Sequence, residues 1–154
     1  MITFFPLFEQ VPGFDHPNSL KERMADAIPE YRGAVADCER VRGTDHPDTL
    51  RARNNLAMAY RAAGRTAEAI PLLEQTLADF ERVRGASHPD TVTTRNNLAM
   101  AYRAAGRMAE AIPLLERTLA DRERMLGADH PDTKAAREDL AALTREPKRH
   151  RRVR

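Results

Sequence analysis

The sequence predicts an all-α protein, built as a short solenoid of helical hairpins, and two observations support this. Residues 43–84 and 85–126 are near copies of each other, each 42 residues long and identical at 32 positions. Self-similarity at a fixed period of this size is typical of helical repeat arrays. The composition agrees, because a chain with 5% aromatic residues, no Trp and abundant Ala, Leu, Glu and Arg favours helix over a β-sandwich.

The first helix of the repeat is predicted from the segment His46–Thr49, which reads HPDT. This pattern indicates a helix start with Asp48 as the N-cap. Gly64 is expected to end the helix in a left-handed conformation. Between these points the apolar residues fall at helical spacing, and they are Leu50, Leu56, Ala57, Tyr60 and Ala63.

The second helix of the repeat is expected to start at Thr66, whose hydroxyl would cap it, and to run about 18 residues, or roughly 27 Å. Gly43, Gly85 and Gly127 follow the ends of successive second helices and are predicted C-caps. The apolar stripe of this helix consists of Ala69, Ile70, Leu73, Leu77 and Phe80.

Shorter units flank the two full repeats. Residues 13–42 match the repeat but lack 12 residues, so one kinked helix is expected from about Ser19 to Arg42, with Pro29 and Gly33 as its weak points. Residues 127–145 supply a single helix with a charged outer face, which suits the end cap of a solenoid. Residues 1–12 form a poorly defined N-terminal segment, and residues 146–154 a basic tail.

The repeat resembles the 42-residue tetratricopeptide repeat of kinesin light chains and of similar bacterial arrays. The resemblance rests on the NNLA and HPDT segments of both copies. It covers residues 43–145 well and 13–42 in part, although Arg53 stands where the shorter family pattern has Trp. The resemblance implies antiparallel helix pairs stacked into a right-handed superhelix. It also implies a concave groove, lined by the first helices, that binds peptides.

A polar stripe on the first helices is the candidate groove, because its residues recur at helical spacing on a face distinct from the apolar stripe. Asn amides can hold an extended peptide backbone, Met gives adaptable apolar contact, and Arg can pair with carboxylates. Two other readings stay open: a merely solvated face, or an Asn that only holds a neighbouring loop. The predicted groove residues are Arg51, Asn54, Met58, Arg61, Thr93, Asn96, Met100 and Arg103.

One histidine recurs per unit, as His16, His46, His88 and His130. A shared metal site is not expected, since an intervening helix is expected to separate equivalent helices of adjacent repeats. Each packing step is roughly 8–10 Å, and zinc needs its nitrogens at about 2.0–2.1 Å. A structural role in the inter-repeat loops is predicted instead. No metal ligand, catalytic residue or cofactor site is predicted, because no phosphate-binding loop or hydrolase motif occurs. The carboxylates of the second helices are expected to be solvated or in local pairs, and they are Glu68, Glu74, Asp79 and Glu81.

These observations favour a non-catalytic protein–protein interaction scaffold that binds an extended, preferably acidic, peptide. One alternative is a regulatory or sensor module detached from a larger signalling NTPase. Another is nucleic-acid binding through residues 148–154, which carry five basic side chains but no aromatic for stacking. Short arrays have few neighbouring repeats to stabilise them, so one of three outcomes is expected: marginal stability, self-association through the open N-terminal face, or origin as a piece of a longer array.

The compartment is expected to be the cytoplasm. Cys38 is the only cysteine, which excludes an internal disulfide, and no 18-residue apolar run or secretory signal is present. Cys38 itself is predicted to have no special role. Arg outnumbers Lys by 22 to 3, which we interpret as the codon usage of a GC-rich, bacterial genome.

Overall fold

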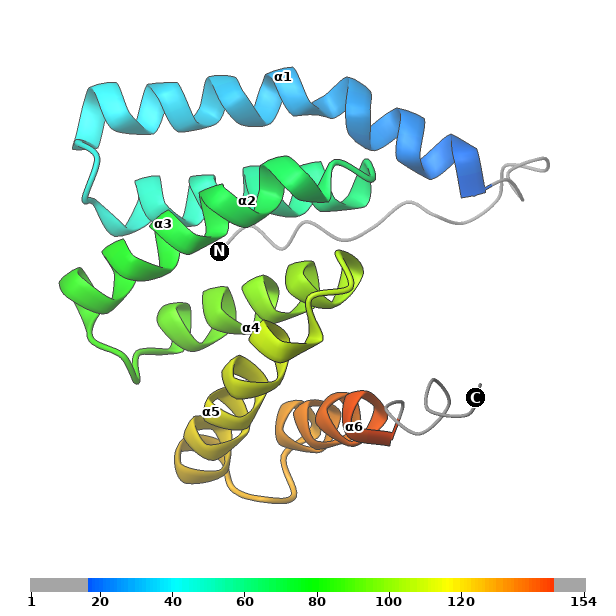
Figure 1. Cartoon of the computed structure of the whole chain (residues 1–154). Helices are drawn as coiled ribbons and strands as arrows, with labels where there is room; N and C mark the ends of the chain where they lie inside the picture. Colours follow the sequence, from blue (N-terminus) through cyan, green and yellow to red (C-terminus); the bar gives the residue numbers. More distant parts are fainter. Residues whose placement is uncertain (1–16, 146–154) are drawn as a thin grey trace.

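The computed structural model describes residues 17–145, and this part of the chain is six α-helices joined by short loops (Figure 1). The single helix expected before the full repeats is present as α1, and Pro29 lies inside it. Three of the expectations fall outside the described part of the chain: the N-terminal segment 1–12, His16 and the basic tail 146–154. The helices are α1 (Pro17–Arg42), α2 (Pro47–Ala62), α3 (Thr66–Arg84), α4 (Pro89–Ala104), α5 (Met108–Leu126) and α6 (Pro131–Arg145).

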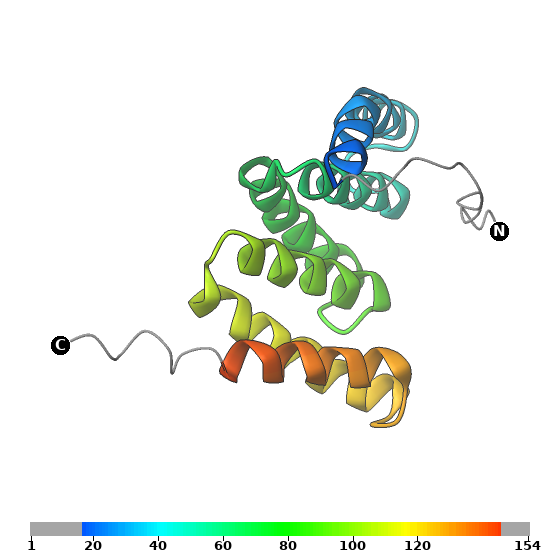
Figure 2. The same ribbon diagram turned by 90° about the vertical axis from the view of Figure 1, so that its right-hand side faces the viewer.

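The helices stack in chain order, so each one packs against the next (Figures 1 and 2). Beyond these consecutive contacts, α2 also contacts α4 directly. The described residues therefore form a short all-α repeat array in which the hairpins α2–α3 and α4–α5 are the full repeats. The first helices α2 and α4 are in direct contact, so the expectation that an intervening helix separates equivalent helices is wrong for this pair.

Histidine, not aspartate, caps the first helix of each repeat. His46 is the N-cap of α2, and its Nδ1 accepts a hydrogen bond from the Asp48 N–H at 3.1 Å. His88 does the same at the start of α4. The prediction of Asp48 as the cap is therefore wrong, because Pro47 occupies the first helical position and moves Asp48 into the first turn. The structural role predicted for the loop histidines is confirmed at these positions.

The turn inside the repeat is closed by backbone hydrogen bonds around Gly64. Gly64 has a φ of +78°, and its N–H and that of Arg65 donate to the carbonyls of Arg61 and Tyr60. This pair of bonds is a Schellman motif and confirms the predicted left-handed helix end. Thr66 is not a cap, because α3 begins at Thr66 itself, and the N-cap residue Arg65 makes no capping side-chain bond.

The core follows the two predicted apolar stripes. In α2, Leu50, Leu56 and Ala57 are buried, while Tyr60 and the C-cap residue Ala63 are half-buried. All five residues predicted for the stripe of α3, from Ala69 to Phe80, are buried as well. The main apolar cluster extends from α2 through α3, α4 and α5 to Leu143 of α6. A smaller cluster joins α1 to α2 around Ile28 and Leu56.

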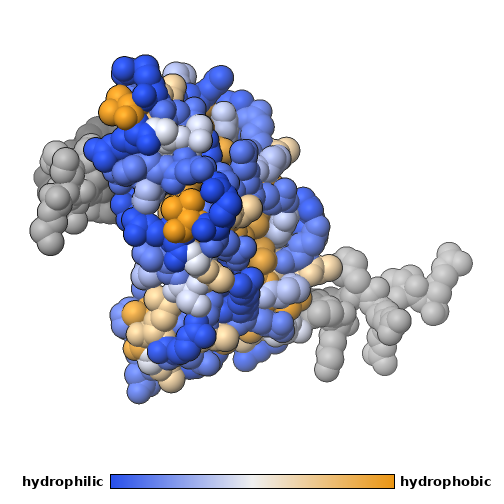
Figure 3. Space-filling view, turned by 90° about the vertical axis from the view of Figure 1, so that its left-hand side faces the viewer, coloured by the Kyte–Doolittle hydropathy of each residue, from blue (hydrophilic) through white to orange (hydrophobic). Residues whose placement is uncertain are grey.

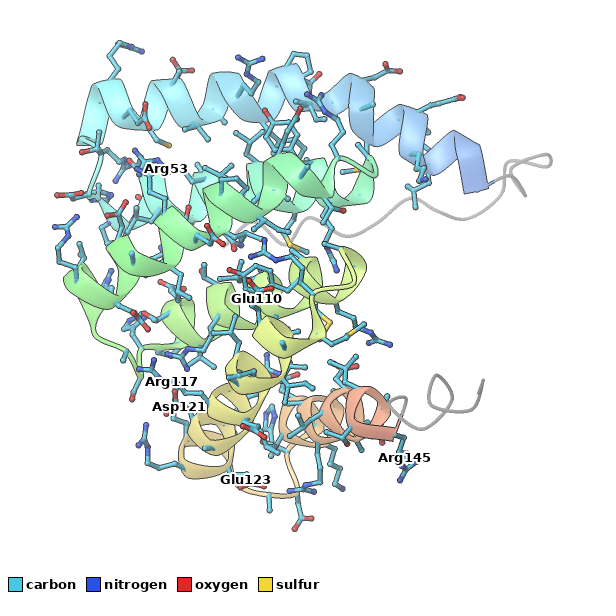
Figure 4. All side chains as sticks on the ribbon, in the orientation of Figure 1. Arg53, Glu110, Arg117, Asp121, Glu123 and Arg145 are labelled. Carbon is cyan, nitrogen blue, oxygen red and sulfur yellow. The ribbon has the colours of Figure 1, made fainter. Side chains whose placement is uncertain are left out.

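A buried arginine replaces the aromatic residue of the shorter family pattern. The Arg53 side chain lies in the space between α1, α2 and α3, where it donates to Glu39 at 2.7 Å and to Asp79 at 3.2 Å (Figure 4). Arg95 repeats the arrangement with Asp121 at 2.6 Å and has no exposed surface. The expectation of solvated or locally paired carboxylates is therefore wrong for Asp79, because an arginine 26 residues earlier needs a buried counter-charge.

The surface is mostly hydrophilic. Figure 3 shows, on the face that it presents, separated apolar spots rather than one continuous apolar patch. Cys38 is half-buried in α1. Within residues 17–145, no helix is both long enough and apolar enough to cross a membrane. In the same range, no group of three or more His, Cys, Asp or Glu side chains is placed to hold a metal ion.

Candidate functional site: the face of the first helices

Two polar contacts join α2 to α4 on the face where the groove is predicted. Arg51 donates from Nη2 and Nε to Oδ2 of Asp90, at 2.8 and 3.2 Å. One turn further along α2, Asn54 Oδ1 accepts a hydrogen bond from Asn97 Nδ2 at 3.1 Å. These contacts hold the first helices of adjacent repeats in register. Asp90 and Asn97 are absent from the predicted set, although both recur once per repeat.

Asn54 therefore has a structural partner. The sequence pattern left open that one of the two adjacent Asn residues only holds a neighbouring loop, and the observed partner is of a different kind. The Asn54 Oδ1 is used by Asn97, which comes from the next first helix and not from a loop. The side chain remains half-buried, so part of it stays accessible on the groove face. An amide carries two donors and an oxygen with two lone pairs, so this bond leaves Asn54 further hydrogen-bonding capacity.

A hollow of about 230 Å³ opens between α2 and α4, directly beside these contacts. Three predicted groove residues, Arg51, Asn54 and Thr93, belong to its lining. The hollow is smaller than the pockets that enclose drug-sized ligands. It suits a single side chain of a longer partner. The other lining residues are Asn55, Phe80, Asp90 and Thr94.

A second hollow, of about 410 Å³, opens between α1 and α2. Met58 and Arg61, both predicted, line it from α2, and Met24 and Tyr31 line it from α1. The sequence pattern assigns the groove only to residues of α2 and α4. It misses Met24 and Tyr31 because α1 is the incomplete repeat and carries no polar stripe of the predicted type.

The two hollows share one lining residue, Asn55 of α2. This face of the described helices therefore presents adjoining depressions, one mostly apolar beside α1 and one lined mainly by polar residues beside α4. Arg61 makes no ion pair with any residue in the described part of the chain, whereas Arg51 is held by Asp90 and Asp48. The hydrogen bond from Arg51 to Asp90 also raises the pKa of Arg51, so this guanidinium stays charged and paired.

The three remaining predicted residues lie on α4, on the side toward α6. Asn96 has a buried Oδ1 with no hydrogen-bond partner among the described residues. Its counterpart Asn54 is satisfied by Asn97, but the residue one repeat after Asn97 is Asp139, a carboxylate that cannot donate when ionised. Arg103 lies 3.6 Å from Asp139. Met100 packs against the main apolar cluster, so it is partly a core residue.

Tyr102 forms a separate polar contact on the far side of α4. Its hydroxyl donates to Glu74 Oε1 at 2.5 Å, and the Arg107 guanidinium lies 4.5 Å from its ring centroid. Burial, followed by the hydrogen bond and negative charge of Glu74, raises the pKa of Tyr102 to about 12. This contact ties α4 to α3 and is structural. It is not part of the groove.

Comparisons with known proteins agree with this geometry. Two tetratricopeptide repeat models match residues 18–82 and 91–132. Among solved structures, a putative kinesin light chain of Podosopora anserina with nearly identical TPR-like repeats is 30% identical, with a TM-score of 0.75 over 84% of this chain and 67% of that chain. A single-substitution form of the same protein is also 30% identical, with a TM-score of 0.74 over 85% of this chain and 68% of that chain.

BtubC (BKLC) from P. vanneervenii shares the fold at 22% identity, with a TM-score of 0.71 over 79% of this chain and 49% of that chain. No curated protein matches the chain significantly. The family models, the solved relatives and the hairpin geometry lead to the same assignment. The chain belongs to the tetratricopeptide repeat family, in its kinesin light chain-like form.

Proposed function

We propose that this protein is a non-catalytic scaffold that binds an extended peptide across the concave face of α1, α2 and α4. The tetratricopeptide fold serves in general as a protein-interaction scaffold. The observation that carries the finer proposal is the pair of adjoining hollows that meet at Asn55. A peptide that crosses both would meet apolar side chains beside α1 and amides beside α4.

The partner segment is preferably acidic. Arg61 lines the larger hollow and has no ion pair within the described chain, so a carboxylate of the partner can pair with it without displacing an existing contact. Arg51 is already held by Asp90 and contributes less. Met24, Met58 and Tyr31 supply the apolar part of the same hollow, and Met adapts readily to different side chains.

The proposal is tested with a probe selected on the protein itself. A phage-displayed library of random peptides is panned on the full chain, and the enriched peptide is labelled and titrated by fluorescence anisotropy. Enrichment of Asp and Glu is expected. The double variant Asn54→Ala, Asn96→Ala should weaken binding by about tenfold or more, roughly 1.4 kcal/mol, with the thermal midpoint recorded for both proteins.

Asn97→Ala is the matched control, because it removes the same Asn54–Asn97 hydrogen bond but leaves the Asn54 amide in place. It should bind the peptide nearly as well as the unaltered protein. If the double variant keeps full affinity, the groove assignment is wrong. If Asn97→Ala loses as much affinity as the double variant, the amides act only by holding α2 to α4.

A further inference from the structure

The arginine of each first helix in a full repeat bridges the second helices on its two sides. Arg53 of α2 donates to Glu39 of the preceding α1 and to Asp79 of the following α3. Arg95 of α4 makes the equivalent contacts one repeat later, at 3.6 Å to a glutamate of α3 and at 2.6 Å to Asp121 of α5. A complete bridge therefore needs a glutamate before the first helix and an aspartate after it.

Each end of the described array contains only one part of this bridge. Arg137 of α6 pairs with Glu123 of the preceding α5 at 2.8 Å, but no helix within residues 17–145 packs on its other side to supply the aspartate. Asp37 of α1 is the equivalent aspartate, and among the described helices α1 packs only against α2, so no first helix supplies its arginine. α1 and α6 lie at opposite ends of the stack (Figure 1), so these two groups do not meet within one copy.

The exposure of the two charged groups reflects the missing neighbours. The side chains of Asp79 and Asp121 are 19% and 10% exposed, whereas that of Asp37 is 74% exposed. Arg53 and Arg95 are buried, whereas the Arg137 side chain is 47% exposed. Asp37 and Arg137 thus have the same chemistry as a buried pair, but each lies on an uncovered surface.

The existing contact of Asp37 belongs to the same repeated arrangement. In Asp79, Oδ1 accepts from Arg82 of its own helix while Oδ2 accepts from the arginine of α2, at 3.2 Å each. Asp121 divides its two oxygens in the same way. In Asp37, Oδ1 accepts from Arg40 at 3.4 Å, and no described residue donates to Oδ2. The second oxygen is therefore left for the arginine of another first helix.

A second pair of complementary groups lies beside the first. In the first full repeat Asp45, in the loop before α2, accepts from Arg82 of α3 at 2.7 Å. Ser87 accepts the equivalent bond in the next repeat, from the arginine of α5. The corresponding residues at the two ends are Asp129, before α6, and Arg40 of α1, and the Asp129 side chain is fully exposed. The charges at the two ends are therefore complementary in two places.

The apolar surfaces of the two ends fit this contact but are smaller than those inside the array. α1 offers Ala27 and Ala34, at positions that have no exposed surface in α3. α6 offers Leu140 and Ala141, which are half-buried and whose counterparts in α2 are buried. Lys134 is exposed where α2 and α4 have a buried Leu and Val. Less apolar area is buried in such a contact, so association should be reversible and depend on concentration.

We propose that copies of this protein associate head to tail, with α6 of one copy packed against α1 of the next, so that Arg137 of the first pairs with Asp37 of the second. The contact has the register of an internal hairpin, and Asp129 meets Arg40 in it. Because it joins two different surfaces of the chain, association continues beyond two copies, into a ring or an open helical assembly. The proposal does not depend on peptide binding.

The first test measures the mass of the full chain by sedimentation equilibrium over a series of protein concentrations. The mass of the unaltered protein should rise above that of one chain as concentration increases. Asp37→Lys and Arg137→Glu should each stay at the mass of one chain, because each places like charges in the contact. A mixture of the two variants should associate again, since Arg137 of one copy then meets Asp37 of the other. Circular dichroism confirms that each variant is folded.

Two variants with the same charge changes are the controls, Arg32→Glu and Glu116→Lys. Both residues occupy one position of the repeat that is exposed in every unit, so both variants should associate like the unaltered protein. A symmetric dimer through α1 would survive Arg137→Glu, and one through α6 would survive Asp37→Lys. Either survival overturns the proposal, as does an unaltered protein that has the mass of one chain at every concentration.

The second test checks the register of the contact. Asp129→Lys and Arg40→Glu should each weaken association by about two- to fivefold, the loss of a surface ion pair. With both substitutions in the same chain, the exchanged charges face each other again across the contact, so the double variant should associate more strongly than either single variant. Losses that add in the double variant would show that Asp129 and Arg40 do not meet, and would overturn the proposed register.

Discussion

Arg95 donates to Asp121 at 2.6 Å from a side chain that has no exposed surface, and the same guanidinium donates to the Ala86 carbonyl. The pair joins α4 to α5, and Glu81 of α3 lies 3.6 Å from the same arginine. Arg53 has the same surroundings one repeat earlier, whereas Arg137, one repeat later, is half exposed and pairs with Glu123. No helix follows α6 within the described residues, so Arg137 is not enclosed.

This series predicts that equivalent pairs differ in their contribution to stability. Asp121→Ala leaves Arg95 buried without its main counter-charge, and should lower the free energy of unfolding by about 3–5 kcal/mol. Arg137→Ala breaks a surface pair and should cost less than about 1 kcal/mol. Urea denaturation followed by circular dichroism measures both. Equal losses in the two variants would contradict the role assigned to burial.

The raised pKa of Tyr102 predicts that the free energy of unfolding falls at alkaline pH. Its pKa is raised to about 12 in the folded protein by burial and by Glu74, from an ordinary value of 10.0. A group whose pKa is raised on folding stabilises the protein fully below the unfolded value, and this contribution disappears as pH rises from about 10 to 12. Tyr102→Phe should therefore flatten the fall in unfolding free energy across this window.

Tyrosinate absorbance gives an independent readout, because the chain has three tyrosines and no tryptophan. One of the three should titrate last, and this late step should be missing in Tyr102→Phe. A late step that survives the substitution would show that another tyrosine has the highest pKa.

Asn96 predicts a stabilising substitution. Its buried Oδ1 lacks a donor among the described residues, and Asp139 is the residue one repeat after Asn97, which donates to Asn54. Asp139→Asn should supply that donor and raise the free energy of unfolding by about 0.5–1.5 kcal/mol, since the pair with Arg103 that it also removes is half exposed and contributes little. Glu138→Gln, at an exposed neighbouring position, controls for the loss of one negative charge. The stability of both variants is measured by thermal and urea unfolding. A destabilised Asp139→Asn protein would contradict the proposed hydrogen bond between residue 139 and Asn96.

Arg61 predicts the salt dependence of peptide binding. Arg61→Ala should weaken binding of the selected acidic peptide by about five- to tenfold, roughly 1–1.4 kcal/mol, because a charge-assisted contact is lost. It should also reduce the sensitivity of binding to ionic strength. Arg51→Ala should have a smaller effect, since Asp90 already neutralises that side chain. Anisotropy titrations at low and high salt compare the two, and the reverse order of effects would exclude Arg61 as the anion contact.

The helices and their order can be predicted from the sequence because the same pattern of apolar residues occurs in two copies of the repeat. Leu56, Leu73 and Phe80 fall at helical spacing in one unit, and the 42-residue copy shows which positions are meant to be apolar. The caps are harder to predict. Both Asp48 and Thr66 have the right chemistry for an N-cap, but Pro47 places the helix start at His46, and Arg65 precedes the helix that begins at Thr66.

The predicted groove residues lie on α2 and α4, as their spacing requires, yet that spacing does not reveal their partners. Asn54 pairs with Asn97 of the next first helix and not with its own repeat equivalent Asn96. Met24 and Tyr31 join the face only because α1 packs beside α2. The position of the candidate face on α2 and α4 thus follows from the pattern, and the lining of its hollows follows from the packing.

By itself, the sequence determined the all-α class, the number of full repeats and the apolar stripes, because these depend on short-range periodicity that each repeat carries in full. Only the tertiary structure decided that Arg53 and Arg95 are buried, that Asp79 and Asp121 neutralise them, and that one face of α1 stays open within the described helices. Those properties depend on which helices lie on either side of a residue. Residues 26 positions apart become partners only after the hairpins fold and stack.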